Sequence, residues 1–289
     1  GGPFANIAHG CNSVMATRAG QKLADYVVTE AGFGADLGTE KFMDIKSRTL
    51  GSMPDAVVIV ATIRALKYHG GVTKDKLNKE NLDALNKGFE NLQRHIQNCL
   101  NQFGMNVVVA VNRFKFDSDK EILLLRKLIE SESAIMHLCE HWEKGAAGAT
   151  HLAKDIVKLC QKKNKARTLY GLNQPILTKI ETVAKSIYKA KGIKLSALAR
   201  KKLKAFENLS GVKRMPVCIA KTPYSFSSDP AQLGATLNHT LEIKDLDLKN
   251  GAGFIVIICG PIMTMPGLPL KPAAESIDVN SKGVLEGLF

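Results

Sequence analysis

No hydrophobic stretch in this sequence approaches the ~20 residues that a helix needs to span a bilayer. The six cysteines are scattered and include no C-x-x-C pair, which favours reduced thiols in a cytosolic protein over a disulfide framework or a zinc site. Internal repeats, a nucleophile elbow, a dinucleotide fingerprint and the phosphate-loop pattern G-x-x-x-x-G-K-S/T are also missing from the sequence. These absences predict a cytoplasmic protein that makes no membrane contact.

The composition is that of a globular protein with a strong basic excess. With 289 residues, 45% of them hydrophobic and 23% charged, the chain is long enough for one large or two ordinary domains. Much of the formal net charge of +13 comes from residues 161–167 and 185–204. The second stretch predicts one or two amphipathic helices around Gly192, with lysines facing solvent. The alternatives are attraction of ATP or phosphate and a nucleic-acid footprint, and we expect no nucleic-acid partner.

Apolar runs and helical periodicity alternate along the chain, which predicts an α/β fold: a mostly parallel sheet with flanking helices, plus smaller α/β domains. A long helix is expected over residues 74–103, with Thr73 as its N-cap and Gly104 as its stop. Further strands are predicted over residues 26–29, 56–62, 106–111, 215–220 and 254–258, and further helices over residues 17–23, 119–130 and 149–162. Domain boundaries are expected near residues 105 and 215.

The segment V-A-T-I-R-A-L-K-Y-H-G-G at residues 60–71 continues one of these strands. Because ligands bind where parallel strands end, it predicts a crevice that receives polar side chains. These side chains are Thr62, Arg64, Lys67 and His69. Arg64 is suited to stabilising an anion there; the alternative is that it pairs with Glu30 or Asp36 and holds the strand end.

Two further segments suggest ligand contacts. The glycine-rich residues 30–38 follow a predicted strand, and their glycines either let a ligand approach the backbone closely or form a tight structural turn. Phe114 and Trp142, the only tryptophan, are suited to offset stacking on a flat heteroaromatic ligand. The alternative is that both are core aromatics.

The histidines allow several interpretations. His137 and His141 would share one face of a helix, which is typical of zinc ligands. Their order, His-Leu-Cys-Glu-His, differs from H-E-x-x-H and no third ligand is evident, so we predict no metal site. His9 and His69 are candidates for proton transfer near neutral pH, or for structural hydrogen bonds.

The segments at residues 28–38 and 60–71 resemble formate–tetrahydrofolate ligase, also named 10-formyltetrahydrofolate synthetase. Other matching segments follow in order from the first residue to the last, together with Trp142. They are G-G-P-F-A-N-I-A-H-G at 1–10, V-N-R-F at 111–114, A-K-T-P-Y-S-F at 220–226, M-T-M-P-G-L-P at 263–269 and G-L-F at 287–289.

The resemblance implies three domains and a set of site residues. Residues 1–105 would be the carboxyl-terminal part of a nucleotide-binding domain of the P-loop NTPase type, residues 106–215 a folate-binding α/β domain, and residues 216–289 a small C-terminal domain. The implied folate pocket is Phe114, Leu138 and Trp142; the implied ATP contacts are Ala5, Gly32 and Phe33; the implied catalytic residues are Thr62 and Arg64.

The resemblance also implies the chemistry. The complete enzyme would use ATP with Mg²⁺ to phosphorylate formate, and the N10 amine of tetrahydrofolate would attack the resulting formyl phosphate. Such acyl transfer relies on positioning and anion stabilisation rather than on a covalent nucleophile. Members of the family are similar in being homotetramers that a monovalent cation, K⁺ or NH₄⁺, stimulates.

Members of that family are about twice as long, and their first half carries a phosphate loop with Gly-Lys-Thr that this sequence lacks. We therefore expect the chain, which begins at Gly1-Gly2 without Met or a secretory leader, to be the carboxyl-terminal half and to be inactive alone. The chain departs from the family pattern at two places. It has Lys115 where the family commonly has proline, and its turn at 143–148 has fewer paired glycines than usual. Both departures affect the rim of the implied folate pocket. The alternatives are a folate-binding fragment without ligase activity, a basic nucleic-acid-binding domain and a structural relic.

Overall fold

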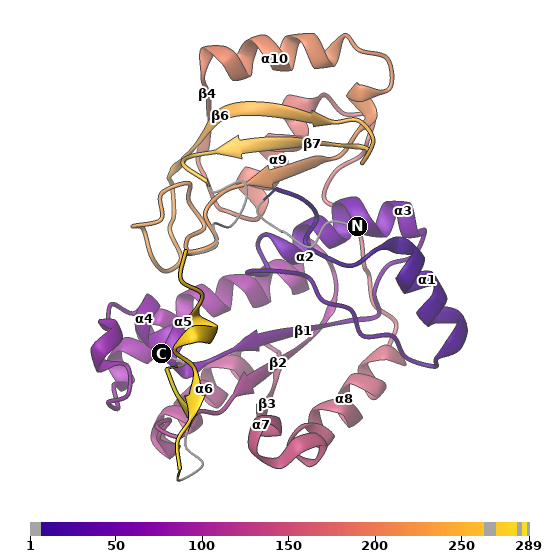
Figure 1. The fold of residues 1–289 in the computed structure, drawn as a ribbon. Coiled ribbons are helices and arrows are strands. Elements are labelled where there is room, and N and C mark those ends of the chain that lie inside the picture. The colour runs from indigo at the N-terminus through magenta and orange to yellow at the C-terminus, as the bar shows by residue number, and fades with distance from the viewer. Residues whose placement is uncertain (1–6, 263–269, 282–284, 288–289) are drawn as a thin grey trace.

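The computed structural model describes residues 7–262, 270–281 and 285–287. Its strands form two main sheets, one above the other in Figure 1, with helices packed around both. The lower sheet has three strands and the upper sheet has four. A separate pair near the C-terminus comprises β8 (Asp278–Val279) and β9 (Leu285–Glu286). The predicted α/β fold with flanking helices is confirmed.

The lower sheet is parallel and follows the chain order β1 (Ala56–Ala61), β2 (Asn106–Asn112) and β3 (Ile135–Cys139). The central strand β2 is buried at residues 107–111, as expected for a β-branched run covered on both faces. The register pairs Ala61 with Val111 and Asn112 with Cys139. The carboxyl ends of all three strands therefore meet at one edge of the sheet.

The helices of the first half of the chain surround this sheet. They are α1 (Val14–Leu23), α2 (Gly38–Lys41), α3 (Ser47–Leu50), α4 (Ile63–His69), α5 (Leu82–Gln97), α6 (Asp119–Ser131), α7 (His141–Lys144) and α8 (Thr150–Cys160). Helix α5 packs against both α4 and α6, and α8 contacts all three strands. A capping box at Ser118 and Glu121 fixes the start of α6.

The helix predicted over residues 74–103 is shorter than expected. It begins after Asn81, whose side-chain oxygen accepts the Ala84 N–H at 2.9 Å, and not after Thr73, which precedes a separate 3₁₀ turn. At its other end the α-helix continues into a π-helical turn, Asn98–Gln102. Gly104 then takes a positive φ of 68°, so the predicted stop is confirmed.

The upper sheet has the order β4-β6-β7-β5. The hairpin of β6 (Thr240–Lys249) and β7 (Phe254–Cys259) is antiparallel, whereas β4 (Gly192–Leu195) and β5 (Val217–Ala220) each pair in parallel with it. Helices α9 (Ile176–Ser186) and α10 (Ala197–Glu207) pack against this sheet.

Three local predictions are wrong. Residues 26–29 form no strand, and Tyr26, Val27 and Val28 are exposed there. Residues 192–195 form β4 rather than a helix because they pair with residues 240–243. Residues 135–139 form β3, so His137 lies on a strand and does not share a helical face with His141.

One apolar core joins the two sheets, because side chains of β1 and β2 belong to the same buried cluster as those of β5, β6 and β7. The domain boundaries near residues 105 and 215 stay a prediction. The sheets group the strands differently: β1 and β2 pair across residue 105, and β4 and β5 share a sheet across residue 215.

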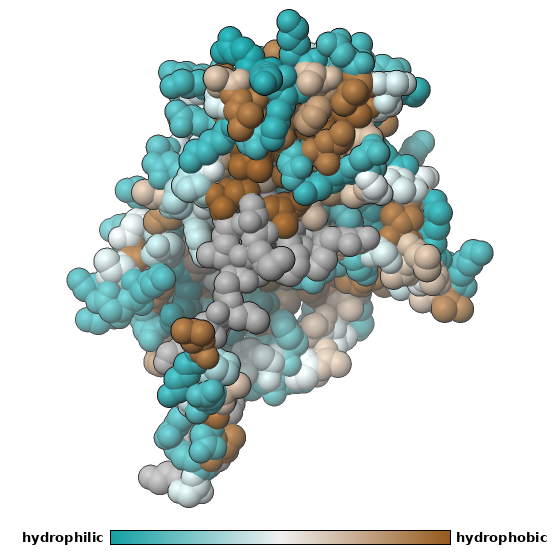
Figure 2. Space-filling view, turned by 45° about the horizontal axis from the view of Figure 1, so that its top comes forward, coloured by the Kyte–Doolittle hydropathy of each residue, from teal (hydrophilic) through white to brown (hydrophobic). Residues whose placement is uncertain are grey.

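The basic stretch around α10 lies on the surface. Ala199 and Leu203 are buried, while Arg200, Lys201 and Lys204 are exposed, which agrees with the predicted solvent-facing lysines. Hydrophilic residues cover much of the top of the molecule in Figure 2, the part that holds α10 in Figure 1. Within the described residues, no helix has the length and apolar character needed to cross a membrane.

Two acidic side chains are buried in the helical segment after Leu37. Glu40 and Asp44 are both 0% exposed. Burial raises the pKa of Glu40 well above its usual range, and the adjacent Asp44 carboxyl raises it further. Burial also raises the pKa of Asp44 to about 6, although the Leu169 N–H and Arg48 oppose this. Both groups therefore hold protons more tightly in the folded state than in the unfolded state.

These raised pKa values predict a pH dependence of stability. A folded state that binds more protons loses stability as pH rises from the unfolded pKa through the folded pKa. The contribution is therefore fully present below about pH 4 and is lost as the pH rises above that, in the case of Asp44 through its folded pKa of about 6. We expect Glu40→Gln to lose less unfolding free energy than the wild type between pH 5 and pH 8, measured by urea denaturation. The exposed Glu143→Gln is the control. Equal losses in wild type and Glu40→Gln would contradict this account.

Candidate functional site

The ends of the three parallel strands place the predicted site residues along one edge of the lower sheet. Thr62 follows β1 directly, Phe114 comes two residues after β2, and Trp142 comes three residues after β3. In the sheet register these strand ends are neighbours. The predicted crevice at the carboxyl ends of the strands therefore has a structural counterpart.

A polar network joins the loops that carry the two aromatic residues. Arg113 forms an ion pair with Glu140 at 2.9 Å, and its backbone N–H donates to the Cys139 carbonyl at 3.0 Å. The Trp142 indole N–H donates to the Arg113 carbonyl at 3.3 Å. Hydrogen bonds from Lys144 and then Arg113 lower the pKa of Glu140, so this carboxylate stays charged and holds both loops.

Both aromatic side chains are exposed. Phe114 is 43% and Trp142 is 70% exposed, so the alternative that they are core aromatics is wrong. Leu138, on β3, is partly buried and packs against the core. An exposed tryptophan whose indole N–H is already bonded to the protein presents its apolar ring to a ligand. The arrangement is suited to binding a flat aromatic group.

Two hydrogen bonds between Phe114 and Asp117 hold the loop after β2 in a tight turn. Asp117 accepts the Phe114 N–H at 2.8 Å and donates its own N–H to the Phe114 carbonyl at 3.0 Å. This turn also exposes Phe116, which is 56% exposed and which sequence reasoning missed. Beyond Trp142, a Cβ on Gly148 would lie 2.4 Å from the Glu140 backbone, so the glycine-poor turn keeps glycine where close approach requires it.

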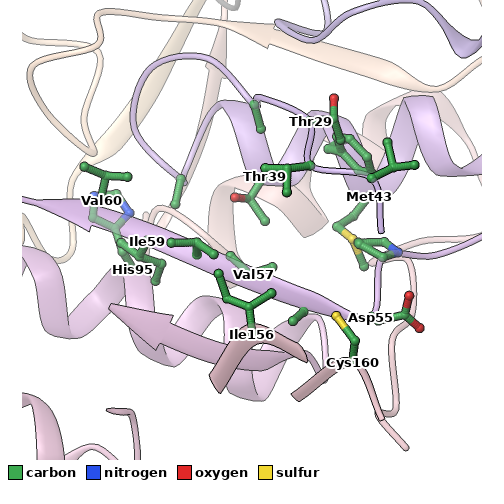
Figure 3. A pocket seen from close by; sticks show the side chains of 18 of the residues that line it. Thr29, Thr39, Met43, Asp55, Val57, Ile59, Val60, His95, Ile156 and Cys160 are labelled. Atoms are coloured by element: carbon green, nitrogen blue, oxygen red, sulfur yellow. The ribbon is translucent and has the colours of Figure 1, made fainter. Parts of the chain in front are cut away.

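A cleft of about 750 Å³ runs along β1. Figure 3 shows β1 crossing it, with Thr39 and Met43 on one side and Ile156 and Cys160 of α8 on the other. Phe33 and Thr62 both line the cleft, so the structure brings together one residue predicted for ATP and one predicted for catalysis. The volume lies in the range of small-molecule and cofactor sites, about 300–1,000 Å³.

The glycine-rich segment forms part of the wall of this cleft. Phe33 is 55% exposed and has a positive φ of 62°. Gly32 donates its N–H to the Gly10 carbonyl at 2.7 Å, and a Cβ on Gly38 would lie 2.4 Å from the Gly32 carbonyl oxygen. The segment is thus a tight turn that also presents Phe33 to the cleft. Ala5, the third predicted ATP contact, lies outside the described residues.

The polar side chains that follow β1 have different partners and do not gather at one site. Thr62 caps α4 by accepting the Ala65 N–H at 3.1 Å, and Arg64 donates to Asn78 rather than to Glu30 or Asp36. Lys67 is 1% exposed and pairs with Glu121 at 2.9 Å. The expectation that Lys67 lies in the crevice is therefore wrong, because its ammonium group fastens α4 to α6.

A second cavity of about 140 Å³ adjoins the cleft. Both are lined by Gly34, His69, Asn91 and His95. Burial lowers the pKa of His95 to about 4, and also lowers that of His69, although Asp36 opposes both shifts. His69 Nδ1 accepts the Gly234 N–H at 3.1 Å, so the proton of the neutral ring is on Nε2. Asn91 and His95 were missed. The one signal for them in the sequence is that two polar residues at i and i+4 lie beside the apolar stripe of the amphipathic helix α5.

The segment A-K-T-P-Y-S-F at residues 220–226 lines this second cavity, and its buried Lys221 holds it in place. Lys221 is 0% exposed and pairs with Asp36 at 2.7 Å. Its ammonium group also donates to the carbonyls of Thr222, at 3.1 Å, and Ser225. Burial lowers the pKa of Lys221, and Asp36 opposes that shift. The segment therefore fastens the end of β5 to the loop before α2.

The remaining histidine and cysteine predictions concern metals and redox state. His137 pairs with Asp155 at 3.0 Å, and burial lowers the pKa of His9. All six cysteines are free thiols. Among the residues that the structure describes, no three His, Cys, Asp or Glu side chains gather as a metal site would require.

Comparison with known proteins identifies the family. The family model described as formate–tetrahydrofolate ligase matches residues 1–289. The chain is 54% identical over 290 residues to the formate–tetrahydrofolate ligase of Pelagibacter ubique, covering 100% of this chain and 51% of that protein. It is 54% identical to that of Hyphomonas neptunium over 289 residues and 53% identical to that of Symbiobacterium thermophilum over 289 residues, each covering 100% of this chain and 52% of the relative.

The chain thus spans about half the length of the curated relatives that it matches, and the matched region is their carboxyl-terminal half. The match extends over every segment on which the resemblance rests, from residue 1 to residue 289. We conclude that the chain belongs to the formate–tetrahydrofolate ligase family.

Proposed function

We propose that this chain supplies the tetrahydrofolate-binding face and part of the nucleotide wall of an ATP-dependent formate–tetrahydrofolate ligase. The observation that carries the proposal is the pair of exposed rings, Phe114 and Trp142, held on linked loops at neighbouring strand ends. Family membership supplies the substrates. A pterin is flat and heteroaromatic, so it stacks well on such rings, with Leu138 as the apolar wall.

In the proposed reaction, a formate oxygen attacks the γ-phosphorus of ATP, and ADP leaves as formyl phosphate forms. The N10 amine of tetrahydrofolate then attacks the formyl carbon, the C–O bond to phosphate breaks, and N10 loses its proton. No covalent bond to the protein is needed, so the contribution of the chain is orientation of the folate and stabilisation of the developing anion.

The cleft along β1 is the proposed nucleotide wall. Phe33 is exposed in it and Thr62 lies at its carboxyl-end side, so Phe33, with Gly32 and Ala5, would contact the adenine region. Thr62 and Arg64 would act near the transferred formyl group. Mg²⁺ commonly binds through one or two carboxylates plus substrate phosphates, and we assign it and the monovalent cation no ligand in this chain.

A fusion protein tests this proposal. In it, the unmatched half of the Pelagibacter ubique ligase precedes residue 1, and formation of 10-formyltetrahydrofolate from formate and ATP is measured. We expect the fusion to be active and Trp142→Ala to raise the KM for tetrahydrofolate about fivefold or more, because a stacked ring contributes about 1–3 kcal/mol.

Phe33→Ala is the matched control, since it also removes an exposed aromatic ring. It should raise the KM for ATP and leave the KM for tetrahydrofolate within about twofold. A Trp142→Ala fusion with the wild-type KM for tetrahydrofolate would contradict the proposal. Formate-dependent ATP turnover by the isolated chain would contradict the expectation that it is inactive alone.

A further inference from the structure

The net charge of the chain is concentrated in one segment. Residues 161–214 contain 15 lysines and arginines and only 2 acidic residues, a net charge of +13. The rest of the chain has 25 basic and 25 acidic residues, so its formal net charge is zero. Basic residues that serve solubility alone are interspersed with acidic ones, whereas an excess gathered in one place attracts an anionic partner.

Helix α10 and the 3₁₀ turn Val212–Arg214 bring five of these basic side chains to one surface, because the two elements contact each other. All five are exposed, and we call their surface the α10 face: Arg200, Lys201, Lys204, Lys213 and Arg214. The ion pairs nearby involve other lysines, namely Lys185, Lys194 and Lys202. The α10 face lies at the top of Figure 1, on the outer side of the upper sheet, and its positive charge is open to solvent.

The α10 face also exposes apolar side chains. Leu198 is 51% exposed and Leu209 is 47% exposed, and Ala205, which lies between them in the sequence, is exposed as well. Leu198 and Ala205 are separated by about two helical turns, so they lie on one line of the helix. Leu209 follows in the turn that ends α10, where its N–H donates to the Phe206 carbonyl at 3.2 Å. Leucines bordered by lysine and arginine are typical of a helix that lies on a membrane surface.

Two other anionic ligands fit this face less well. Single-stranded nucleic acids are bound by exposed aromatic rings, but the aromatic residues of this segment are buried or half-buried: Tyr170, Tyr188 and Phe206. Contacts to phosphates would also leave the leucines in water, whereas a lipid interface removes them from it. The folate of the proposed site does not reach this face, because α10 and α7, which carries Trp142, lie at opposite ends of the molecule in Figure 1.

We propose that the α10 face binds reversibly to the surface of membranes that contain anionic phospholipids. Its basic side chains would lie at the lipid headgroups, with Leu198 and Leu209 in the interface below them. Clusters of about 4–8 lysines and arginines on an amphipathic helix are typical of such binding. The sequence predicted no membrane contact because no stretch could cross a bilayer, but a helix that lies on the surface needs no such stretch. The inference does not rest on the proposed function.

Sedimentation with lipid vesicles tests the inference. The chain, and the fusion in which the unmatched Pelagibacter ubique half precedes residue 1, are each mixed with vesicles of phosphatidylcholine alone or with one third phosphatidylserine. We expect both proteins to bind the phosphatidylserine vesicles at least about tenfold more tightly, and to lose this preference when NaCl is raised from about 0.1 M to about 1 M. Equal binding to the two kinds of vesicle at low salt would overturn the inference. Binding by the chain but not by the fusion would overturn it as well, because the other half would then cover the α10 face.

Two double variants locate the binding surface. Lys201→Glu with Lys204→Glu reverses two charges on the α10 face, and Lys162→Glu with Lys163→Glu makes the same change in net charge at exposed lysines after α8. We expect the first to weaken binding to the phosphatidylserine vesicles at least about tenfold and the second by less than about threefold. Equal losses would contradict the inference, since binding would then follow net charge and not the α10 face.

The leucines distinguish a membrane from other polyanions. Leu198→Ser with Leu209→Ser should weaken vesicle binding about fivefold or more, while Leu123→Ser, at a leucine of α6 that is 57% exposed, should leave it unchanged. If the leucine pair had no effect, or if duplex DNA bound more tightly than the vesicles, the partner would be a nucleic acid or another polyanion and the inference would be wrong. A fusion that binds vesicles but makes no 10-formyltetrahydrofolate would contradict the proposed function and leave this inference standing.

Discussion

Replacement of Gly88 by alanine should destabilise the protein by about 3 kcal/mol, although alanine is the better helix former by about 1 kcal/mol. Gly88 lies in α5, where a Cβ would be 1.7 Å from the Leu66 carbonyl oxygen and 2.9 Å from the Gly70 N atom. Helices α4 and α5 can approach so closely only without that Cβ, and α4 carries Thr62 at its start. Urea denaturation measures the loss.

Gly20→Ala is the matched control, because it makes the same change in the exposed helix α1. A Cβ there would lie 3.2 Å from a methyl group of Val27, which is 37% exposed and able to move. We expect an unchanged unfolding free energy or a gain of up to about 1 kcal/mol from helix propensity. If Gly88→Ala were as stable as Gly20→Ala, the close packing of α4 on α5 would be refuted.

The second large effect concerns the buried pair of Lys221 and Asp36. Lys221→Met should cost about 3–5 kcal/mol of unfolding free energy, since it leaves the Asp36 carboxylate buried without its cation. The two side chains are 0% and 6% exposed and 2.7 Å apart. Thermal or urea denaturation of the variant measures the loss. Adding Asp36→Asn should recover part of it, because the amide removes the unpaired charge.

The same substitution at Lys249 is the control. Lys249 pairs with Asp247 at 2.6 Å, but the side chains are 47% and 46% exposed. Exposed pairs contribute about 0–1 kcal/mol, so Lys249→Met should be nearly neutral. If Lys221→Met and Lys249→Met lost similar amounts of unfolding free energy, burial would not be the reason that the pair of Lys221 and Asp36 stabilises the fold.

Strong local patterns determined which elements could be predicted. The continuous β-branched runs of β1 and β2 were found because such runs are typical of strands in a parallel sheet. Strands β3 and β4, with only 5 and 4 residues, were missed because such short segments owe their conformation to their partner strands. The ten-residue strand β6 was missed as well. Residues 26–29 have a strand-like sequence, but no strand in the described chain pairs with them, which shows that propensity alone is insufficient.

The candidate site was partly predictable because some of its residues lie at the ends of predicted strands. Thr62 ends one predicted strand and Phe114 follows another, so the rule that ligands gather at carboxyl ends selected both as candidates. Phe116 was missed because nothing in the sequence distinguishes an exposed aromatic from a buried one. Lys67 and Lys221 are buried because of partners distant in sequence, Glu121 and Asp36, and no local pattern reveals such pairing.

Titration of the chain with tetrahydrofolate tests the central claim most directly. Trp142 is the only tryptophan, so intrinsic fluorescence, corrected for absorption by the folate, reports the environment of this side chain. We predict saturable quenching. We expect Phe114→Ala to weaken the affinity for tetrahydrofolate about fivefold or more, while Phe33→Ala leaves that affinity within about twofold. Fluorescence that stays unchanged while tetrahydrofolate binds, or affinity that is the same in Phe114→Ala, would contradict a folate site at these two rings.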